Sequence, residues 1–347
     1  MEFQAVQRFI EHSIEQNFLP GAVLCIANKK DILLNKAFGK AHVKREIPMT
    51  ENTLFDIASL TKVVATTPAI LLLLEQGLLD LDDSIAYYFS ELQGFHEEVT
   101  IKHLLTHTSG FQPEVRFYLE EYVQKSPLEV IAQIQNRKAI GSEVIYSDVN
   151  YILLGKLVEK VSGEPLQIFA QKNIFIPLQM KHTLFNPPSD LQSQIAATEY
   201  RDHLQDYQWG DVHDENANFF GGVSGHAGLF STAEDLARYT QAFMKGQSSI
   251  FSEGSKRISK QSYTSVLDEQ RGLGWQLYSN PNFSGQYLQD GFGHTGFTGT
   301  SIWVSDEQEL VIVLLTNRVH YGRQCNIQRF RRITHNLIEI EVENSRK

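Results

Sequence analysis

The sequence has little cysteine: only Cys25 and Cys325 occur among its 347 residues. Two thiols cannot form the disulfide framework of a small secreted protein, and they cannot supply a cysteine-rich metal site. The two side chains could meet in space, but we favour the interpretation that both are buried apolar thiols. The fold must therefore depend on a hydrophobic core, which a chain of this length can readily form.

The sequence also lacks an excess of positive charge. It has 31 Lys and Arg residues against 41 Asp and Glu residues, which gives a net charge of −10 at pH 7. A protein with this charge is not attracted to the phosphates of nucleic acids or to anionic lipid surfaces. We therefore expect neither a nucleic acid nor an anionic membrane as a partner.

No long apolar run is present. The longest, Ala69 to Leu74, is far too short to cross a bilayer, so no transmembrane segment is expected. The segment from Met1 to Val6 has no basic region followed by an apolar core, which a secretory signal would have. If Met1 is the natural start, this predicts a cytoplasmic protein. A chain from which a leader had been removed would look the same.

Strand patterns lie near both ends of the chain, and no repeat or low-complexity linker separates them. Apolar segments alternate there with polar turns, which is typical of hairpins, and an amphipathic helix is predicted outside each set of strands. The strands are expected at 22–27, 32–38, 274–278, 300–304 and 310–316, and the helices at 3–17 and about 325–340.

The middle of the chain is predicted to be mostly helical. Helices are expected at 60–76 with Gly77 as the stop, and at 101–105, 127–136, 151–161 and 233–243. Strands at both ends with helices between them indicate an α/β (α+β) fold, with one antiparallel sheet built from both chain termini and flanked by the terminal helices. The turn-rich stretch 191–218 is expected to be a long surface or active-site loop.

We expect a single domain over 1–347. Its sheet part would comprise about 1–55 and 270–347, and an inserted, mostly helical part would comprise about 56–269.

The first candidate motif for chemistry is Ser59-Leu60-Thr61-Lys62. Residues three apart share one face of a helix, so the Lys62 amine can reach the Ser59 hydroxyl. Ser59 would lie at a helix N-terminus, where free N–H groups favour a developing oxyanion. To accept a proton near neutrality, Lys62 would need a pKa well below 10.4. Taken alone, a capping serine with a surface lysine is the simpler interpretation.

Two further motifs follow. Tyr146-Ser147-Asp148 offers a phenol that can act as a base or proton shuttle, with a polar residue two positions later; the simpler alternative is a loop in which Asp148 caps the next helix. The segment Gly293–Gly299, which leads into a strand, has glycines that let another backbone approach closely. The backbone N–H groups of Phe297 and Ser59 could then form an oxyanion hole. The alternative is a glycine-rich turn.

In this order the three motifs resemble those of the serine β-lactamase and penicillin-binding protein superfamily. The tyrosine in the middle motif is similar to the class C β-lactamase branch, which includes DD-peptidases and esterases. Four further segments look like recurring segments of that family, so the resemblance covers nearly the whole chain. They are Pro20–Val23, Leu78–Asp83, Ile101–Gly110 and Gly228–Leu236.

The resemblance implies an α/β sandwich beside an all-helical region, with the site between them. It implies that Ser59 is the acylated nucleophile and that Lys62 and Tyr146 handle its proton. Asp148, His294, Thr295 and Gly296 would contact substrate. The family commonly has asparagine at the position of Asp148 and lysine at that of His294. These departures argue against efficient β-lactam turnover and are compatible with peptidase, amidase or esterase action.

Two histidine-containing regions allow a metal as an alternative. The segments around His213-Asp214-Glu215 and Gly225-His226 look like the penicillin-binding proteins associated with cell-wall muropeptides. Their side chains could be proposed as metal ligands, but the spacing matches no familiar zinc pattern, and we favour loops that shape the pocket. His103 and His107, one helical turn apart, are interpreted as structural. We expect no metal and no cofactor.

The sequence therefore predicts a serine hydrolase that forms a covalent acyl-enzyme on amide bonds of peptidoglycan-derived or D-amino-acid peptides. β-Lactams are expected as covalent ligands. A carboxylesterase with the same Ser59, Lys62 and Tyr146 is the first alternative, and a non-catalytic binding or sensing domain is the second. The expected partners are small molecules or peptides, and no oligomeric state is indicated.

Overall fold

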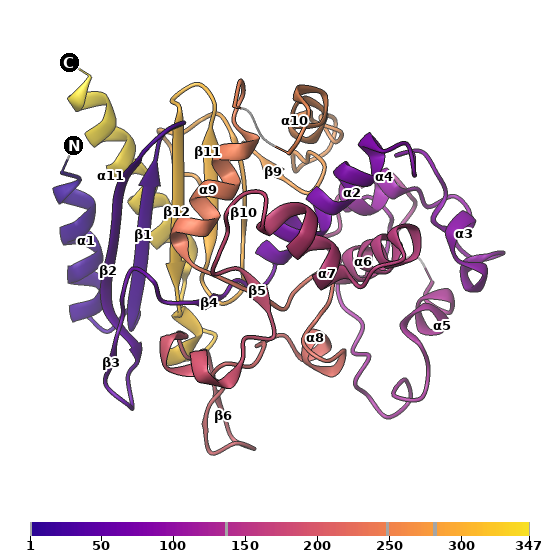
Figure 1. Ribbon diagram of the computed structural model, residues 1–347, viewed down its shortest axis with the longest axis horizontal. Coiled ribbons are helices and arrows are strands. Elements are labelled where there is room, and N and C mark those ends of the chain that lie inside the picture. The colour runs from indigo at the N-terminus through magenta and orange to yellow at the C-terminus, as the bar shows by residue number, and fades with distance from the viewer. Residues whose placement is uncertain (1, 136–137, 248–249, 280–282, 347) are drawn as a thin grey trace.

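The computed structural model describes residues 2–135, 138–247, 250–279 and 283–346. Its centre is a seven-stranded antiparallel sheet in the order β3-β2-β1-β12-β11-β10-β9. The strands are β1 (Gly21–Ala27), β2 (Ile32–His42), β3 (Ile47–Pro48), β9 (Gln276–Leu277), β10 (Phe292–Thr295), β11 (Ser301–Ser305) and β12 (Leu310–Thr316). Because β1 pairs with β12, the two chain ends meet in the middle of the sheet (Figure 1). The predicted α/β fold is confirmed.

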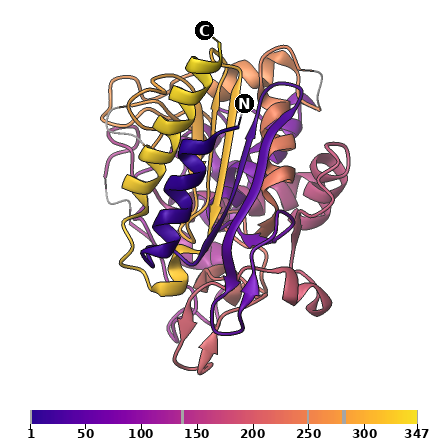
Figure 2. The same ribbon diagram turned by 90° about the vertical axis from the view of Figure 1, so that its left-hand side faces the viewer.

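The terminal helices α1 (Gln4–Glu15) and α11 (Ile327–Ser345) lie side by side on one face of the sheet, as Figure 2 shows. Side chains alternate across a strand, so Ala22, Leu24 and Ile26 of β1 pack in the apolar cluster under these helices. Val23 and Cys25 face the other way. With both faces covered, β1 is buried along its whole length, which explains its continuous apolar sequence.

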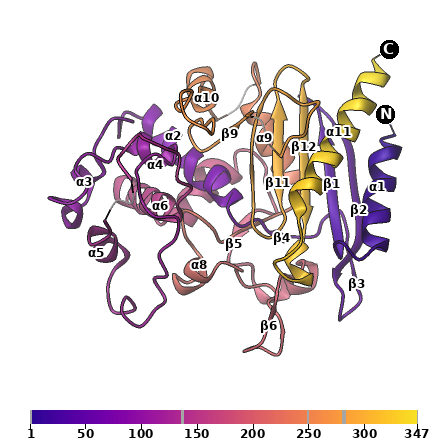
Figure 3. The ribbon, with the colours of Figure 1, turned by 180° about the vertical axis from the view of Figure 1, so that it is seen from behind.

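The opposite face of the sheet carries α9 (Ala233–Phe243), which contacts β1 and β12. Beyond α9 lies the helical part of the molecule (Figures 1 and 3). Its α-helices are α2 (Thr67–Glu75), α3 (Ile85–Tyr88), α4 (Ile101–Leu105), α5 (Pro127–Ala132), α6 (Asp148–Ser162), α7 (Leu166–Ala170), α8 (Glu215–Phe219) and α10 (Glu253–Lys260). One apolar cluster runs from the sheet face into these helices, so the two parts share a core.

Shorter elements connect these parts. A small sheet has the order β4-β8-β5, and β6 pairs with β7 in a hairpin. These strands are β4 (Phe55–Asp56), β5 (Leu184–Phe185), β6 (Tyr200–Arg201), β7 (Asp206–Tyr207) and β8 (Leu229–Ser231). The 3₁₀ segments are Ser90–Leu92, Ser189–Gln194 and Arg318–Tyr321, and the π-helical ones are Lys62–Thr66 and Gln171–Phe175.

Four predicted elements differ in the structure. The stretch expected to be one helix at 60–76 is π-helical at Lys62–Thr66 and α-helical only in α2. Pro68, in the first turn of α2, has no N–H and cannot continue the α-helical hydrogen-bond pattern from the preceding turn. The 191–218 stretch is not all loop, because β6 and β7 lie within it and α8 begins in it. The strand expected at 274–278 is reduced to β9, and Gly274 has a positive φ of 80°. The helix at 127–136 ends at Ala132, and residue 136 lies outside the described residues.

The division into a sheet part and a helical part within one domain stays a prediction. Both cysteines are free; Cys25 is buried, whereas Cys325 is half-buried and donates to the Phe18 carbonyl at 3.6 Å. Across the described residues, none of the helices combines the length and the apolar character needed to span a bilayer.

Candidate active site

Ser59 lies on a tight turn between β4 and the helical residues that begin at Leu60. The turn is strained at Ala58, whose φ of 48° is unusual for a residue with a side chain. The buried Asp56 supports it by accepting a hydrogen bond from the Ala58 N–H at 2.8 Å. Ser59 is thus held at a helix N-terminus, as the sequence predicted.

Lys62 is fully buried and makes the contact that the motif predicts. Its Nζ donates to Ser59 Oγ at 2.9 Å. It also donates to Asp148 Oδ1 at 2.8 Å and to the His226 carbonyl at 3.3 Å. These three acceptors hold the ammonium group within hydrogen-bond distance of the serine hydroxyl.

The environment of Lys62 keeps its proton on. Burial alone would lower the pKa of this lysine, but the negative charge of Asp148, supported by Tyr146, outweighs burial and raises the pKa above its usual value. The lowered pKa that a lysine base needs near neutrality is therefore absent in the free protein. Lys62 is an ammonium group there, which favours the proton-relay role over the base role.

Asp148 is the first residue of α6 rather than its cap. Ser147 occupies the N-cap position, and its backbone N–H donates to His107 Nδ1 at 3.1 Å. The alternative interpretation of Asp148 as a helix cap is wrong, because its carboxylate bonds Lys62 instead, and the predicted contact of Asp148 with substrate stays a prediction. Asp148 therefore belongs to the site through its ion pair with Lys62.

Tyr146 has two cations close to its ring. Lys62 Nζ is 4.8 Å from the centre of its ring, and the guanidinium carbon of Arg271 is 5.6 Å from it. The rings of His107 and His294 lie 4.5 Å and 5.9 Å from the Tyr146 ring. Tyr146 is thus surrounded by two cations and two imidazole rings.

His294 is held neutral. It lies on β10, only 3% exposed, with Nδ1 against the Thr295 carbonyl at 2.9 Å. Burial and the positive charges of Arg271 and Lys62 hold the pKa of His294 well below its usual 6.5. His294 is therefore not a cation near neutrality, and a charge change around pH 6.5 is not expected of it.

The turn between β10 and β11 is bound to the serine loop. Thr298 Oγ1 donates to the Asp56 carbonyl at 2.7 Å, and Thr300 Oγ1 donates to the Ile57 carbonyl at 3.1 Å. Gly296 packs so tightly that a Cβ there would come within 2.4 Å of the Ile57 carbonyl oxygen. Among the described residues, no protein acceptor is bonded to the backbone N–H of Ser59 or of Phe297. Both donors needed for an oxyanion hole are thus available.

These residues surround a cavity of about 530 Å³. Every predicted site residue except Lys62, which lies beneath the cavity floor, lines it: Ser59, Tyr146, Asp148, His294, Thr295, Gly296 and Phe297. The lining also includes residues to which the sequence analysis gave no role in the site. They include Glu114, Arg271, Gln276, Arg318, Arg323 and Arg331.

Arg271 is the most informative of the residues that sequence reasoning missed. It is only 4% exposed, and its Nη2 pairs with Glu269 at 2.6 Å. Its Nε and Nη1 are buried and have no hydrogen-bond partner within the described residues. Buried donors of this kind are normally satisfied. A lone arginine before Gly272 carries no recognisable pattern, so only the tertiary structure reveals it.

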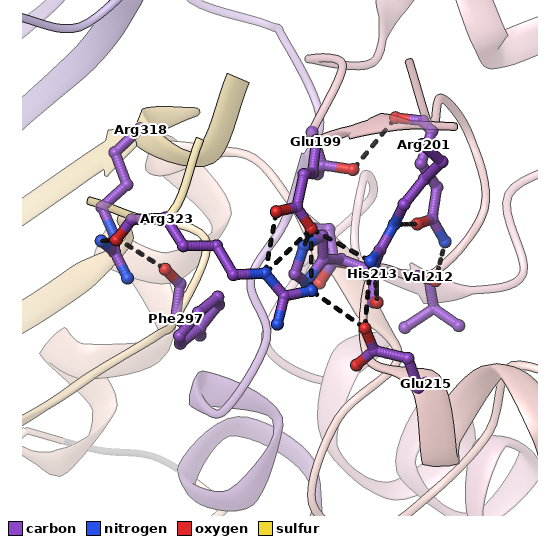
Figure 4. A network of polar contacts seen from close by, with 11 residues as sticks. Glu199, Arg201, Val212, His213, Glu215, Phe297, Arg318 and Arg323 are labelled. Atoms are coloured by element: carbon purple, nitrogen blue, oxygen red, sulfur yellow. Dashed lines mark hydrogen bonds and ion pairs between the residues drawn. The ribbon is translucent and has the colours of Figure 1, made fainter. Parts of the chain in front are cut away.

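One rim of the cavity is a charged network (Figure 4). Arg323 lies between two carboxylates, with Nη2 at 2.8 Å from Glu199 and 2.9 Å from Glu215. His213 bonds the same Glu199 at 3.0 Å, and its ring stacks on Phe297 at 5.7 Å. Although burial alone would raise the pKa of Glu199, His213 and Arg323 lower it overall. The network fixes the 199–215 segment against the cavity.

The segment around His226 contacts the site through Lys62, whose ammonium group donates to the His226 carbonyl. His226 Nε2 bonds Asp214 Oδ1 at 2.8 Å, and its Nδ1 bonds Ser224 Oγ at 2.8 Å. Asp148, Asp214 and His226 offer ligand atoms within 4.8 Å of one another, close enough for a metal ion. The Lys62 ammonium already bonds Asp148 in this group, and its charge opposes a second cation. The two structural histidines also have local partners: His103 in the capping box of α4, and His107 against Ser147.

Comparisons with known proteins agree on the family. Residues 6–334 match the model of the family described as Beta-lactamase. A protein of Escherichia coli O157:H7 named "Putative D-alanyl-D-alanine carboxypeptidase" is 33% identical, over 91% of this chain and 82% of its own length. An N-acetylmuramyl-L-alanine amidase of Bacillus subtilis (strain 168) is 32% identical, over 92% of this chain and 81% of its own.

A solved structure shows the same fold. The octameric penicillin-binding protein homologue from Pyrococcus abyssi superposes with a TM-score of 0.77 at 26% identity, covering 98% of this chain and 78% of that one. The family match spans nearly the whole chain and includes all three motifs around the cavity. The chain belongs to the Beta-lactamase family.

Proposed function

We propose that the protein is a serine hydrolase that cleaves amide bonds of peptidoglycan-derived or D-amino-acid peptides through a covalent acyl-enzyme. The single observation that carries the proposal is the position of Ser59. Its hydroxyl lies at an open cavity, 2.9 Å from a buried lysine ammonium, beside two backbone N–H groups that have no acceptor among the described residues. The names of the two curated relatives support an amide substrate.

In the proposed reaction, Tyr146 takes part as a phenolate. Ser59 Oγ attacks the substrate carbonyl carbon, and its proton passes to the Tyr146 oxygen. The carbonyl oxygen becomes an oxyanion between the N–H groups of Ser59 and Phe297. Collapse of this intermediate breaks the carbon–nitrogen bond, and the proton returns through Tyr146 and Lys62 to the leaving amine. Water then hydrolyses the ester on Ser59 by the same route in reverse. β-Lactams are expected to acylate the same oxygen.

Because Lys62 is charged, we expect Asp148→Asn to change the pH dependence of acylation. Without the carboxylate, the strongest influence that opposes burial is removed and only that of Tyr146 remains, so the pKa of Lys62 falls and the ammonium form is lost at a lower pH than in wild type. If the ammonium is the active form, the alkaline fall in acylation rate shifts to lower pH. Stopped-flow acylation across pH 6–10 measures this. Asp148→Glu keeps the charge and is the control. Faster acylation of Asp148→Asn at neutral pH would show instead that neutral Lys62 is the base.

The cation for a substrate carboxylate is proposed to be Arg271 rather than His294. Arg271 lines the cavity, and two of its buried donors have no hydrogen-bond partner within the described part of the chain, whereas His294 is neutral near pH 7. For a peptide ending in a free carboxylate, KM should therefore stay level from pH 6 to 9, because the guanidinium charge does not change in this range.

Substitution tests this assignment. Arg271→Met should raise KM for the carboxylate peptide about 10- to 100-fold, as expected for a lost charge-assisted hydrogen bond. A neutral p-nitrophenyl ester should keep its KM, and Arg271→Lys should retain part of the peptide affinity. A KM that rises between pH 6 and 7 in wild type, and not in His294→Gln, would return the anchor to His294.

A carboxylesterase with the same site is the second candidate, because a neutral His294 leaves no cation in the third motif itself. An ester substrate does not need a cation to bind a carboxylate. The ratio of kcat/KM for a D-alanyl-D-alanine peptide to that for the ester therefore shows which of the two activities is preferred. We expect the peptide to be preferred. If only the ester is cleaved, the amide proposal fails; if wild type cleaves neither and no β-lactam labels it, the non-catalytic alternative holds.

A further inference from the structure

The proposed oxyanion hole depends on one peptide group, that between Gly296 and Phe297. Its N–H is one of the two donors without a protein acceptor at the cavity. Its carbonyl oxygen, on Gly296, accepts a hydrogen bond from Arg331 Nη2 at 3.2 Å. Because a peptide group is planar, whatever holds its carbonyl also sets the direction of its N–H.

Arg331 is built into the fold at this point. It comes from α11 and is only 2% exposed. The same Nη2 also donates to the Thr300 carbonyl at 2.7 Å. Thr300 accepts the Gly296 N–H at 2.7 Å as well, so the guanidinium joins both ends of the turn between β10 and β11.

The neighbouring peptide groups are held by other partners. Arg318 Nε donates to the Phe297 carbonyl at 2.8 Å, and Thr316 Oγ1 donates to the Gly299 carbonyl at 3.0 Å. Arg331 is thus the side chain that contacts the carbonyl of the oxyanion-hole peptide itself, and this carbonyl also accepts the Gly299 backbone N–H at 3.2 Å. Burial lowers the pKa of Arg331 to about 9, so it still carries its charge at neutral pH.

A charged donor on the carbonyl has a second effect. Hydrogen bonds in a chain polarise one another, so a cation at the oxygen of a peptide group strengthens its N–H as a donor. The buried location of Arg331 makes this effect larger than it would be in water. The orientation of the peptide group and its polarisation both act on the Phe297 N–H, which would face the developing oxyanion.

We propose that Arg331 is a positioning residue that aims and polarises the Phe297 N–H of the oxyanion hole through the Gly296–Phe297 peptide group. The inference rests on the proposed acyl-enzyme function, which supplies the oxyanion. It joins a buried side chain of the C-terminal helix, at the edge of the cavity, to the reaction at Ser59 through the Gly296–Phe297 peptide group.

The test is the carbonyl stretching band of the acyl-enzyme, measured by infrared difference spectroscopy with a β-lactam labelled with ¹³C at its reactive carbonyl. A strong hydrogen bond to the ester oxygen lowers this frequency, so a weakened one raises it. We expect Arg331→Met to shift the band to higher frequency and to lower kcat about 10- to 100-fold with KM little changed. Arg331→Lys, which keeps the charge without the planar fork, should lie between the two.

The exposed Arg329 on the same helix provides the matched control, and Arg329→Met should leave the band and the rates unchanged. Thermal unfolding identifies any variant that fails to fold; Arg331→Lys then carries the test. A folded Arg331 variant with a wild-type band and kcat overturns the inference while leaving the proposed function intact. Wild-type protein that forms no acyl-enzyme overturns both.

Discussion

Ser59→Ala is expected to abolish covalent labelling by a fluorescent penicillin and, together with it, hydrolysis of a p-nitrophenyl ester. The hydroxyl is the atom that would form the acyl bond, and no remaining group in the motif can replace it. Lys62 is ammonium in the free protein and so has no lone pair for attack. The cavity and the backbone donors stay in place, so ligand can still bind without reacting.

Intact-mass spectrometry of the labelled protein, followed by peptide mapping, measures the result. Wild type should carry one adduct on the peptide that contains Ser59. Ser224→Ala is a useful control, because this serine is buried behind His226 rather than on the cavity wall and should leave labelling unchanged. An adduct mapped to any other serine would remove Ser59 from the mechanism.

The sequence alone predicted the parts of the site that are local along the chain. Ser59 and Lys62 are three residues apart, so a helical turn is enough to bring them together. The sheet could also be predicted, because strand patterns at both ends leave apolar faces that need partners. The terminal helices followed from their amphipathic stripes, which the structure places on the sheet.

The remaining parts depend on contacts between distant segments, which no local pattern encodes. Arg271 reaches Tyr146 and Arg331 reaches Gly296 only after the sheet and helices have packed. The pKa of His294 was also hidden from the sequence, because burial and two cations set it. The alternative role of Asp148 as a cap came from its position before a helix; the nearby buried ammonium of Lys62 provides a stronger partner.

The structure also explains how a histidine can occupy the third motif without loss of positive charge around Tyr146. The family commonly has lysine at the position of His294, and that lysine would supply a second cation. Here Arg271 approaches the Tyr146 ring instead, from a segment that is far from both Lys62 and His294 along the chain. A second positive charge near Tyr146 is therefore retained, although the third motif has histidine in place of the lysine that would supply it.

Lys62→Met and Tyr146→Phe should each slow single-turnover acylation by about two to four orders of magnitude, the usual loss when a group that transfers a proton is removed. Lys62 bonds the Ser59 hydroxyl directly, and its charge lies 4.8 Å from the Tyr146 ring. Because the two residues would act on one proton, the double variant should be little slower than the slower single variant.

Tyr151→Phe is the matched control for the phenol. The Tyr151 ring lies 5.8 Å from Lys62 Nζ, but its hydroxyl donates to the Leu105 carbonyl in the core rather than facing the cavity. We expect this variant to acylate at nearly the wild-type rate. Thermal unfolding must accompany each measurement, because Lys62→Met leaves Asp148 without its cation; pairing it with Asp148→Asn removes that charge. A folded Tyr146→Phe protein with wild-type acylation would exclude Tyr146 from proton transfer and leave Lys62 as the only candidate among the predicted residues.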